Sequence, residues 1–97
     1  MTESIVMLRI TIDRNPQVLK LRLEGRLEGE WAALAAESWS SERATKGSRQ
    51  IRVDLNDVTF IDAEGKILLA RMHKAGAEFI ARDPMTKAIL TELASSP

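Results

Sequence analysis

Two carboxylates and a glycine lie where a predicted strand meets a predicted helix. The tetrapeptide Asp62-Ala63-Glu64-Gly65 directly follows an apolar run that ends at Ile61. The first turn of a helix has backbone N–H groups without intrahelical partners, and its dipole favours a negative group. Such a junction can present a side chain, or a phosphate carried on it, to a partner. The simpler interpretation is that Asp62 caps the helix and Gly65 permits tight packing, because capping Asp residues are common.

An acid/base or metal-binding trio is the other chemistry these residues could perform. His73 is the only histidine, and it could join Asp62 and Glu64 because histidine titrates near neutral pH. About two and a half helical turns separate His73 from Glu64, and no cysteine or second histidine completes a zinc site. A surface histidine near a helix C-terminus fits better. The chain also has no phosphate-cradling glycine loop, nucleophile elbow or paired-histidine motif, so we expect no metal, no cofactor and no enzymatic activity.

The composition excludes several further classes of function. The chain has 97 residues with 14 basic and 14 acidic side chains, so its formal charge is zero and it has no basic field to attract nucleic acid. No cysteine is present, no apolar run is long enough to span a membrane, and Met1-Thr2-Glu3-Ser4 does not resemble a signal peptide. We expect a single domain over residues 1–97, cytoplasmic and without direct membrane insertion.

The alternation of apolar residues predicts an N-terminal antiparallel hairpin. Residues 4–12 alternate with period two, and residues 19–24 do so more regularly, with a turn at Asp13-Arg14-Asn15-Pro16 between them. We expect Gly25 to end the second strand. A helix follows, with an apolar stripe formed by Trp31, Leu34, Ala35, Ser38 and Trp39. We expect that stripe to fade over residues 40–48 into a polar loop or a fraying helix end.

The second half of the sequence predicts two further strands and two further helices. The pattern predicts a strand over residues 51–61, with a kink or bulge at Asn56-Asp57, and a helix over residues 63–74 that Gly76 stops. Residues 78–81 form a short strand, and Asp83-Pro84 starts the last helix. In the first of these helices one face is shared by Ile67, Leu68, Arg71, Met72 and Ala75, and in the second the predicted buried stripe is Met85, Ile89, Leu90 and Leu93. The order β-β-α-β-α-β-α predicts an α/β fold: a small mixed sheet with parallel strands after the hairpin and helices mainly on one face.

Three segments carry a resemblance to a known family. They are Leu21-Arg22-Leu23-Glu24-Gly25-Arg26-Leu27, Val53-Asp54-Leu55 and Phe60-Ile61-Asp62-Ala63-Glu64-Gly65. Together with the order of elements they resemble a STAS domain, the family of bacterial anti-sigma-factor antagonists and their relatives. The family signature at this junction is Asp-Ser-Ser-Gly or a close variant, and in antagonists a kinase-type anti-sigma factor phosphorylates its first serine. Ala63 stands at that position here and has no hydroxyl, so the resemblance implies a domain without the standard phosphorylation switch.

The resemblance implies a transcription-regulating adaptor that binds a protein. Its expected partner is an anti-sigma factor of the serine kinase/ATPase type or a similar regulator, and the alternative is an accessory role in a membrane transport system. The implied docking residues are Arg26, Glu28, Asp62, Ala63, Glu64, Gly65 and Lys66. Glu64 has two interpretations, a crude phosphate mimic or an ordinary first-turn glutamate, and the second is favoured because one carboxylate lacks a phosphate's charge and oxygens. Many family members continue beyond the last helix predicted here, so we expect a surface there that a homodimer partner or a neighbouring protein could cover.

Overall fold

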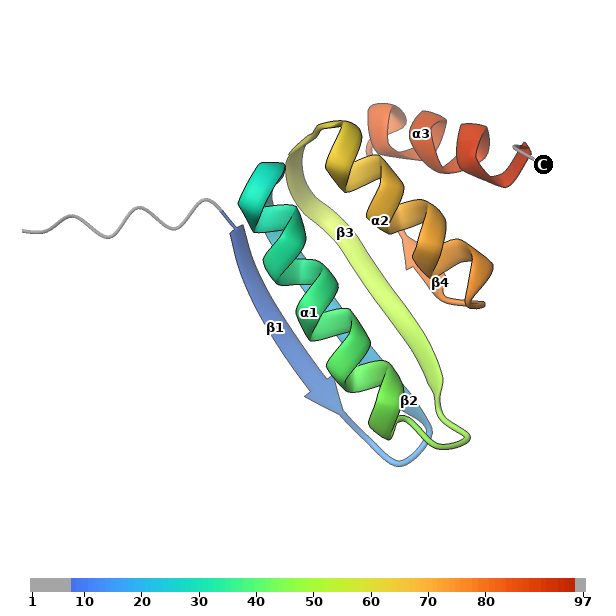
Figure 1. The fold of residues 1–97 in the computed structure, drawn as a ribbon. Helices are drawn as coiled ribbons and strands as arrows, with labels where there is room; N and C mark the ends of the chain where they lie inside the picture. The colour runs from blue at the N-terminus through green and yellow to red at the C-terminus, as the bar shows by residue number, and fades with distance from the viewer. Residues whose placement is uncertain (1–7, 96–97) are drawn as a thin grey trace, which may run out of the picture.

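A computed structural model describes residues 8–95 and shows the predicted order of elements (Figure 1). The elements are β1 (Leu8–Arg14), β2 (Val18–Leu27), α1 (Gly29–Thr45), β3 (Gln50–Ile61), α2 (Ala63–Lys74), β4 (Glu78–Ile80) and α3 (Pro84–Ser95). The described strands form one sheet in the order β1-β2-β3-β4, with β1 and β2 antiparallel and the other pairs parallel. The predicted fold class is confirmed. The predicted strand positions 4–7 lie outside the described residues.

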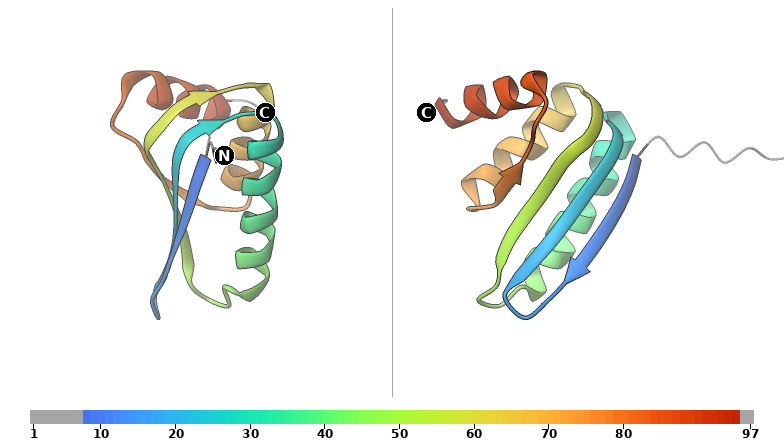
Figure 2. Two further views of the ribbon diagram at one scale, coloured as in Figure 1. Left: turned by 90° about the vertical axis from the view of Figure 1, so that its left-hand side faces the viewer. Right: turned by 180° about the vertical axis from the view of Figure 1, so that it is seen from behind.

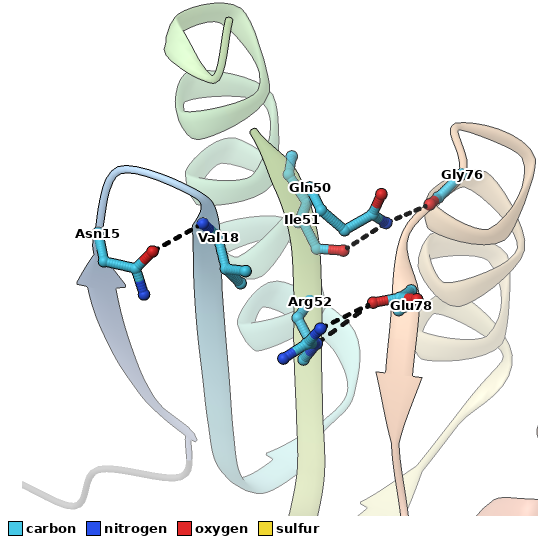
Figure 3. Close-up of polar contacts among 7 residues, drawn as sticks. All are labelled: Asn15, Val18, Gln50, Ile51, Arg52, Gly76 and Glu78. Carbon is cyan, nitrogen blue, oxygen red and sulfur yellow. Dashed lines mark hydrogen bonds and ion pairs between the residues drawn. The ribbon is translucent and has the colours of Figure 1, made fainter. Parts of the chain in front are cut away.

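The hairpin forms because both strands bury one row of side chains. Leu19, Leu21 and Leu23 are fully buried, and Leu8 of β1 is buried beside them. The turn is held by Asn15, whose Oδ1 accepts hydrogen bonds from the backbone N–H groups of Gln17 at 2.9 Å and Val18 at 2.7 Å (Figure 3 shows the second bond). β1 extends through Arg14, two residues further than the alternation indicates.

β2 does not end at Gly25, so that prediction is wrong. The strand continues to Leu27, whose side chain is fully buried. Gly25 has a φ of 110°, which side chains other than hydrogen rarely allow, and the ladder between β2 and β3 shifts between Gly25 and Arg26. The glycine therefore bends the strand instead of stopping it, because the neighbouring strand continues alongside.

β3 contains two bulges that change which residues face the core. Arg22 pairs with Asp54 and Glu24 with Asp57, so the one residue between them in β2 lies opposite two residues of β3, which is the first bulge. In the second bulge, Thr59 is the extra residue without a partner in β2. The buried apolar positions of β3 are accordingly spaced by two, two, three and three residues: Ile51, Val53, Leu55, Val58 and Ile61. The bulge predicted at Asn56-Asp57 is confirmed, and the Oδ1 of Asp54 accepts a hydrogen bond from the Asn56 N–H at 3.0 Å.

α1 extends into residues 40–45 and is rotated relative to the predicted stripe. Of the two alternatives for residues 40–48, the helical one holds as far as Thr45, because the buried carboxylate of Glu42 forms a two-pronged ion pair with Arg14 of β1, at 3.0 and 2.7 Å. Its buried residues are Ala32, Ala35, Trp39 and Glu42. Trp31 is half-buried and Leu34 is 46% exposed, because the helix packs its small alanines against the sheet.

α1 and α2 cover the same face of the sheet, and α3 packs against α2 (Figure 2). In α2 the residues Leu68, Leu69 and Met72 are buried. The predicted shared face is therefore only partly inward, because Ile67 is 51% exposed and Arg71 is exposed. The predicted stop at Gly76 is confirmed by its φ of 90° and by a hydrogen bond from its N–H to the His73 carbonyl. In α3 the Oδ2 of Asp83 accepts a hydrogen bond from the Thr86 N–H at 2.7 Å, which confirms the predicted cap.

The predicted stripe of α3 is only partly correct. Ile89, Leu90 and Leu93 pack against the core, but Met85 is 49% exposed and Thr86 is buried in its place. In the first turn, where the Thr86 N–H bonds to Asp83, the inward-facing residue is therefore Thr86 and not Met85.

The opposite face of the sheet is polar and carries a ladder of ion pairs. Lys20 lies 3.7 Å from Asp54, Arg22 lies 2.7 Å from Asp57, and Arg52 lies 3.2 Å from Glu78 (Figure 3 shows the last pair). Outward-facing charges on adjacent strands are thereby matched across the sheet. Within residues 8–95, no helix combines the length and apolarity needed to cross a membrane.

Candidate functional site

The candidate site lies where β2 passes into α1 and β3 passes into α2. Leu27 and Ile61, the last residues of the two strands, pair with each other, and the residues that follow them, Glu28 and Asp62, are the N-caps of α1 and α2. Both helices therefore start at the same end of the sheet (Figure 1). The backbone N–H of Asp62 donates to the Leu27 carbonyl at 3.2 Å and joins the two junctions.

Asp62 binds the starts of both helices. Its Oδ1 accepts a hydrogen bond from the Gly65 N–H at 2.8 Å, and its Oδ2 accepts one from the Gly29 N–H at 2.9 Å. These hydrogen bonds, from Gly65 first and Gly29 second, hold the pKa of Asp62 below its ordinary value because they favour the ionised carboxylate. The capping interpretation is confirmed. The second bond, to Gly29, could not be predicted, because nothing in the sequence near Gly29 indicates that it meets residue 62.

Gly65 is buried because the start of α2 lies directly against the end of β2. A Cβ atom at this position would overlap the carbonyl oxygen of Leu27 and would lie 2.9 Å from Cγ2 of Ile61. No side chain fits there without movement of the backbone. The predicted role of Gly65 in tight packing is confirmed.

Ala63, Glu64 and Lys66 are exposed at the start of α2. Ala63 is the first residue of the helix and directly follows the capping carboxylate. Glu64 lines a groove of about 350 Å³ between α1 and α2, together with Glu37 and Arg71. The side chains of residues 63, 64 and 66 can contact a partner, whereas Asp62 and Gly65 hold the backbone that presents them.

Arg26 and Glu28 form a neighbouring patch at the end of β2. They make a two-pronged ion pair through Nε and Nη2 of Arg26, the latter 3.3 Å from Oε1 of Glu28. The guanidinium also lies over the ring of Phe60, 4.5 Å from its centroid. Phe60 is 38% exposed, although the sequence places it in an apolar run; the bulge at Thr59 turns it outward.

We call Arg26, Glu28, Phe60, Ala63, Glu64 and Lys66 the junction surface. All seven residues implied by the resemblance come from the two junctions at this end of the sheet, five of them on the junction surface and two, Asp62 and Gly65, beneath it. Phe60 is the member that the sequence does not identify.

The acid/base or metal-binding trio is not assembled. His73 is exposed near the C-terminus of α2, whereas Asp62 and Glu64 lie at its start. Both oxygens of Asp62 are already bonded to backbone amides. Among residues 8–95, no group of three histidine, cysteine, aspartate or glutamate side chains could hold a metal ion.

Comparison with solved structures gives close matches of the fold. A crystal structure of an anti-sigma factor antagonist from Mycobacterium paratuberculosis matches with a TM-score of 0.75 and 17% identity, over 90% of this chain and 78% of that chain. The unphosphorylated form of the anti-sigma factor antagonist SpoIIAA matches with a TM-score of 0.67 and 16% identity, over 89% of this chain and 81% of that one.

A third matching structure is itself described as a STAS domain. It is the STAS domain of an anti-sigma-factor antagonist from Rhodobacter sphaeroides, with a TM-score of 0.50 and 15% identity, over 88% of this chain and 95% of that chain. No protein-family model and no curated protein matches the sequence. At these identities the matches establish the fold, so the predicted STAS fold is confirmed.

Proposed function

We propose that this chain is a protein-binding domain that acts as an anti-sigma-factor antagonist in the cytoplasm of a bacterium, without enzymatic activity. Its partner is an anti-sigma factor of the kinase/ATPase type or a similar regulator, and it docks through the junction surface. Support comes from the STAS fold, shared with solved anti-sigma factor antagonists, and from the exposure of Ala63, Glu64 and Lys66 at the β3–α2 junction.

The observation that carries the proposal is the position of Ala63. It is exposed at the first turn of α2, on a backbone fixed by both oxygens of Asp62, so a partner can reach it. Its methyl group has no oxygen to accept a phosphate. Residue 63 cannot gain a phosphate, so the negative charge of a phosphate cannot release the partner at this position. The domain would therefore bind its partner constitutively.

The junction surface also has the features of a small protein interface. It combines an exposed aromatic ring, Phe60, with an arginine that stacks on it, and aromatic and arginine side chains are enriched at interface hot spots. The Arg26–Glu28 pair fixes the guanidinium before any partner arrives, which lowers the entropy lost on binding.

A binding experiment against the kinase-type anti-sigma factors of the same genome tests the proposal. Phe60→Ala and Glu64→Lys should each weaken binding by about tenfold or more, because they remove a contact or reverse a charge at the interface. Asp13→Lys on β1, an exposed charge reversal near the hairpin turn at the opposite end of the sheet, is the matched control and should leave the affinity within about twofold. The proposal would be refuted if the chain bound none of the candidates, or if it captured transport-system components instead.

Restoring the hydroxyl gives a second readout. Ala63→Ser places a serine at the first position of α2, and the cognate kinase should transfer one phosphate to it, detectable by mass spectrometry. The parent chain, incubated in the same way, should gain none at residue 63. A variant that binds the partner but is never phosphorylated would show that the partner is a regulator without kinase activity toward this junction.

A further inference from the structure

A second pocket lies at the other end of α1 and α2, away from the junction surface. It has a volume of about 350 Å³ and lies between the C-terminal halves of the two helices. One side of the pocket is formed by Ala36, Trp39, Ser40 and Arg43 of α1. The other side is formed by Arg71 and Lys74 of α2 and by Ala75, which directly follows α2. Its size falls within the range of pockets that hold small ligands.

Three cations converge on this pocket without a carboxylate. Within residues 8–95, no acidic side chain lies within ion-pair distance of Arg43, Arg71 or Lys74. Four arginines of the strands differ in this respect: Arg14, Arg22, Arg26 and Arg52 are each paired with a glutamate or an aspartate. Other cations without such a partner, for example Arg9 and Lys87, line none of the cavities beside α1 and α2.

Two more cations raise the positive charge next to this pocket. Arg43 also lines an adjoining cavity with Lys46 and Arg49. Lys46 and Arg49 donate to backbone carbonyls at the end of α1, at 3.3 Å from Lys46 Nζ to the Gly47 oxygen and at 2.8 Å from Arg49 Nη2 to the Thr45 oxygen. Carbonyl oxygens carry no net charge, so the five side chains leave a positive field that an anion would neutralise.

We propose that the pocket binds the phosphate group of a phosphorylated small molecule. Arg43 and Arg71 can each offer a planar fork of N–H donors, which matches a phosphate, and Lys74 adds a third charge. The Ser40 hydroxyl can donate a further hydrogen bond. Trp39, Ala36 and Ala75 give the pocket an apolar part, so an organic group attached to the phosphate has a surface to contact. The site is separate from the junction surface and does not depend on the proposed function.

Titrations with inorganic phosphate and with phenyl phosphate, followed by NMR of the isotope-labelled chain, test this inference. The indole N–H of Trp39 should shift in a saturable manner, whereas that of Trp31, near the start of α1, should not. Phenyl phosphate should bind more tightly than inorganic phosphate because of the apolar lining. Sodium chloride at equal ionic strength controls for screening.

Matched variants separate the pocket from general charge. The double variant Arg71→Gln/Lys74→Gln should weaken phenyl phosphate binding by about tenfold or more. Arg9→Gln/Lys87→Gln removes the same total charge from exposed positions elsewhere and should change the affinity by less than about twofold. The unchanged spectrum of each variant would show that it is folded. No saturable shift of Trp39, equal losses in both double variants, or a response to a phosphoserine peptide but to neither small molecule would overturn the proposal.

Discussion

Gly65 shows how one residue sets the geometry of the candidate site. In the interior of a helix, glycine costs about 1 kcal/mol relative to alanine. At Gly65 this cost is offset by the close packing of α2 on β2, because only a residue without Cβ lets α2 start against the Leu27 carbonyl. That contact places Asp62 where its two oxygens reach the first amides of both helices. The exposed positions 63, 64 and 66 are therefore held by residues that a partner does not need to touch.

Gly65→Ala should destabilise the domain by about 3 kcal/mol, even though alanine favours helix formation. The added Cβ would overlap backbone, which cannot rotate away as a side chain can. Chemical denaturation measures the change in the free energy of unfolding. Gly76→Ala is the control: it has a φ of 90°, but a methyl group added there would meet no neighbouring atom within 4 Å, so it should cost only about 1 kcal/mol. An equal or smaller effect at Gly65 would show that the close approach is not rigid.

The low pKa of Asp62 links the site to the stability of the fold. A carboxylate whose pKa is lower in the folded chain stabilises the fold above its unfolded pKa, and this stabilisation is lost as the pH falls through the folded value. Asp62→Asn should therefore lower Tm at pH 7, and the difference from the parent chain should shrink on acidification below about pH 4.

Thermal melts over this pH range measure that difference. Asp13→Asn removes an exposed carboxylate of β1 and should leave Tm at pH 7 nearly unchanged. A difference between the parent and Asp62→Asn that stayed constant as the pH fell would show that Asp62 acts through packing and not through its charge.

The two bulges of β3 determine what this strand presents at its end. Each adds one residue that has no partner in β2, and each moves the next buried position by one, to Val58 and then to Ile61. Without them, the strict alternation that starts at Ile51 would bury residues 57, 59 and 61. The bulges thus keep Asp57 and Thr59 exposed, and the second one turns Phe60 outward beside Arg26.

Deletion of Thr59 should leave the fold intact. Val58, Phe60 and Ile61 would then alternate in, out and in opposite Gly25, Arg26 and Leu27, which are their present partners. We expect a cooperative unfolding transition within about 1 kcal/mol of the parent. Deletion of Asp54, which pairs with both Arg22 and Ile80, is the contrasting case. It would turn Leu55 outward and should cost more than about 3 kcal/mol. Similar losses in both variants would contradict the assigned bulge.

The sequence predicts those features that depend on neighbours along the chain. The alternation of β1 and β2, the caps at Asp62 and Asp83 and the stop at Gly76 are local patterns, and each agrees with the structure. The errors, and the alternatives that stay open, arise where distant residues decide. The ion pair between Glu42 and Arg14 extends α1, and the continuing β3 carries β2 past Gly25. The second bond of Asp62, to Gly29, depends on the same long-range arrangement, so the full site could not be predicted.

The charges of the molecule are balanced in number but not in position. The net charge is zero, and the helix-free face of the sheet matches its charges in pairs. The groove between α1 and α2 does not: both carboxylates, Glu37 and Glu64, line the part near the helix starts, whereas Arg43 and Lys74 line the other part, and Arg71 borders both. A ligand that binds at one end of this groove therefore experiences the electrostatic field of the charges at that end, which the total charge of the molecule does not describe.

Glu64→Lys tests whether local or total charge governs the phosphate pocket. The substitution raises the net charge from 0 to +2, so a mechanism based on total charge predicts tighter binding of phenyl phosphate. Position 64 lies roughly 10 to 15 Å along α2 from Arg71 and Lys74, beyond the Debye length of about 8 Å at physiological salt. We therefore expect the affinity from the Trp39 titration to stay within about twofold of the parent at that salt concentration. A severalfold gain would show that the pocket has no local selectivity, and the same variant should still weaken docking at the junction surface, because there the charge itself is in contact.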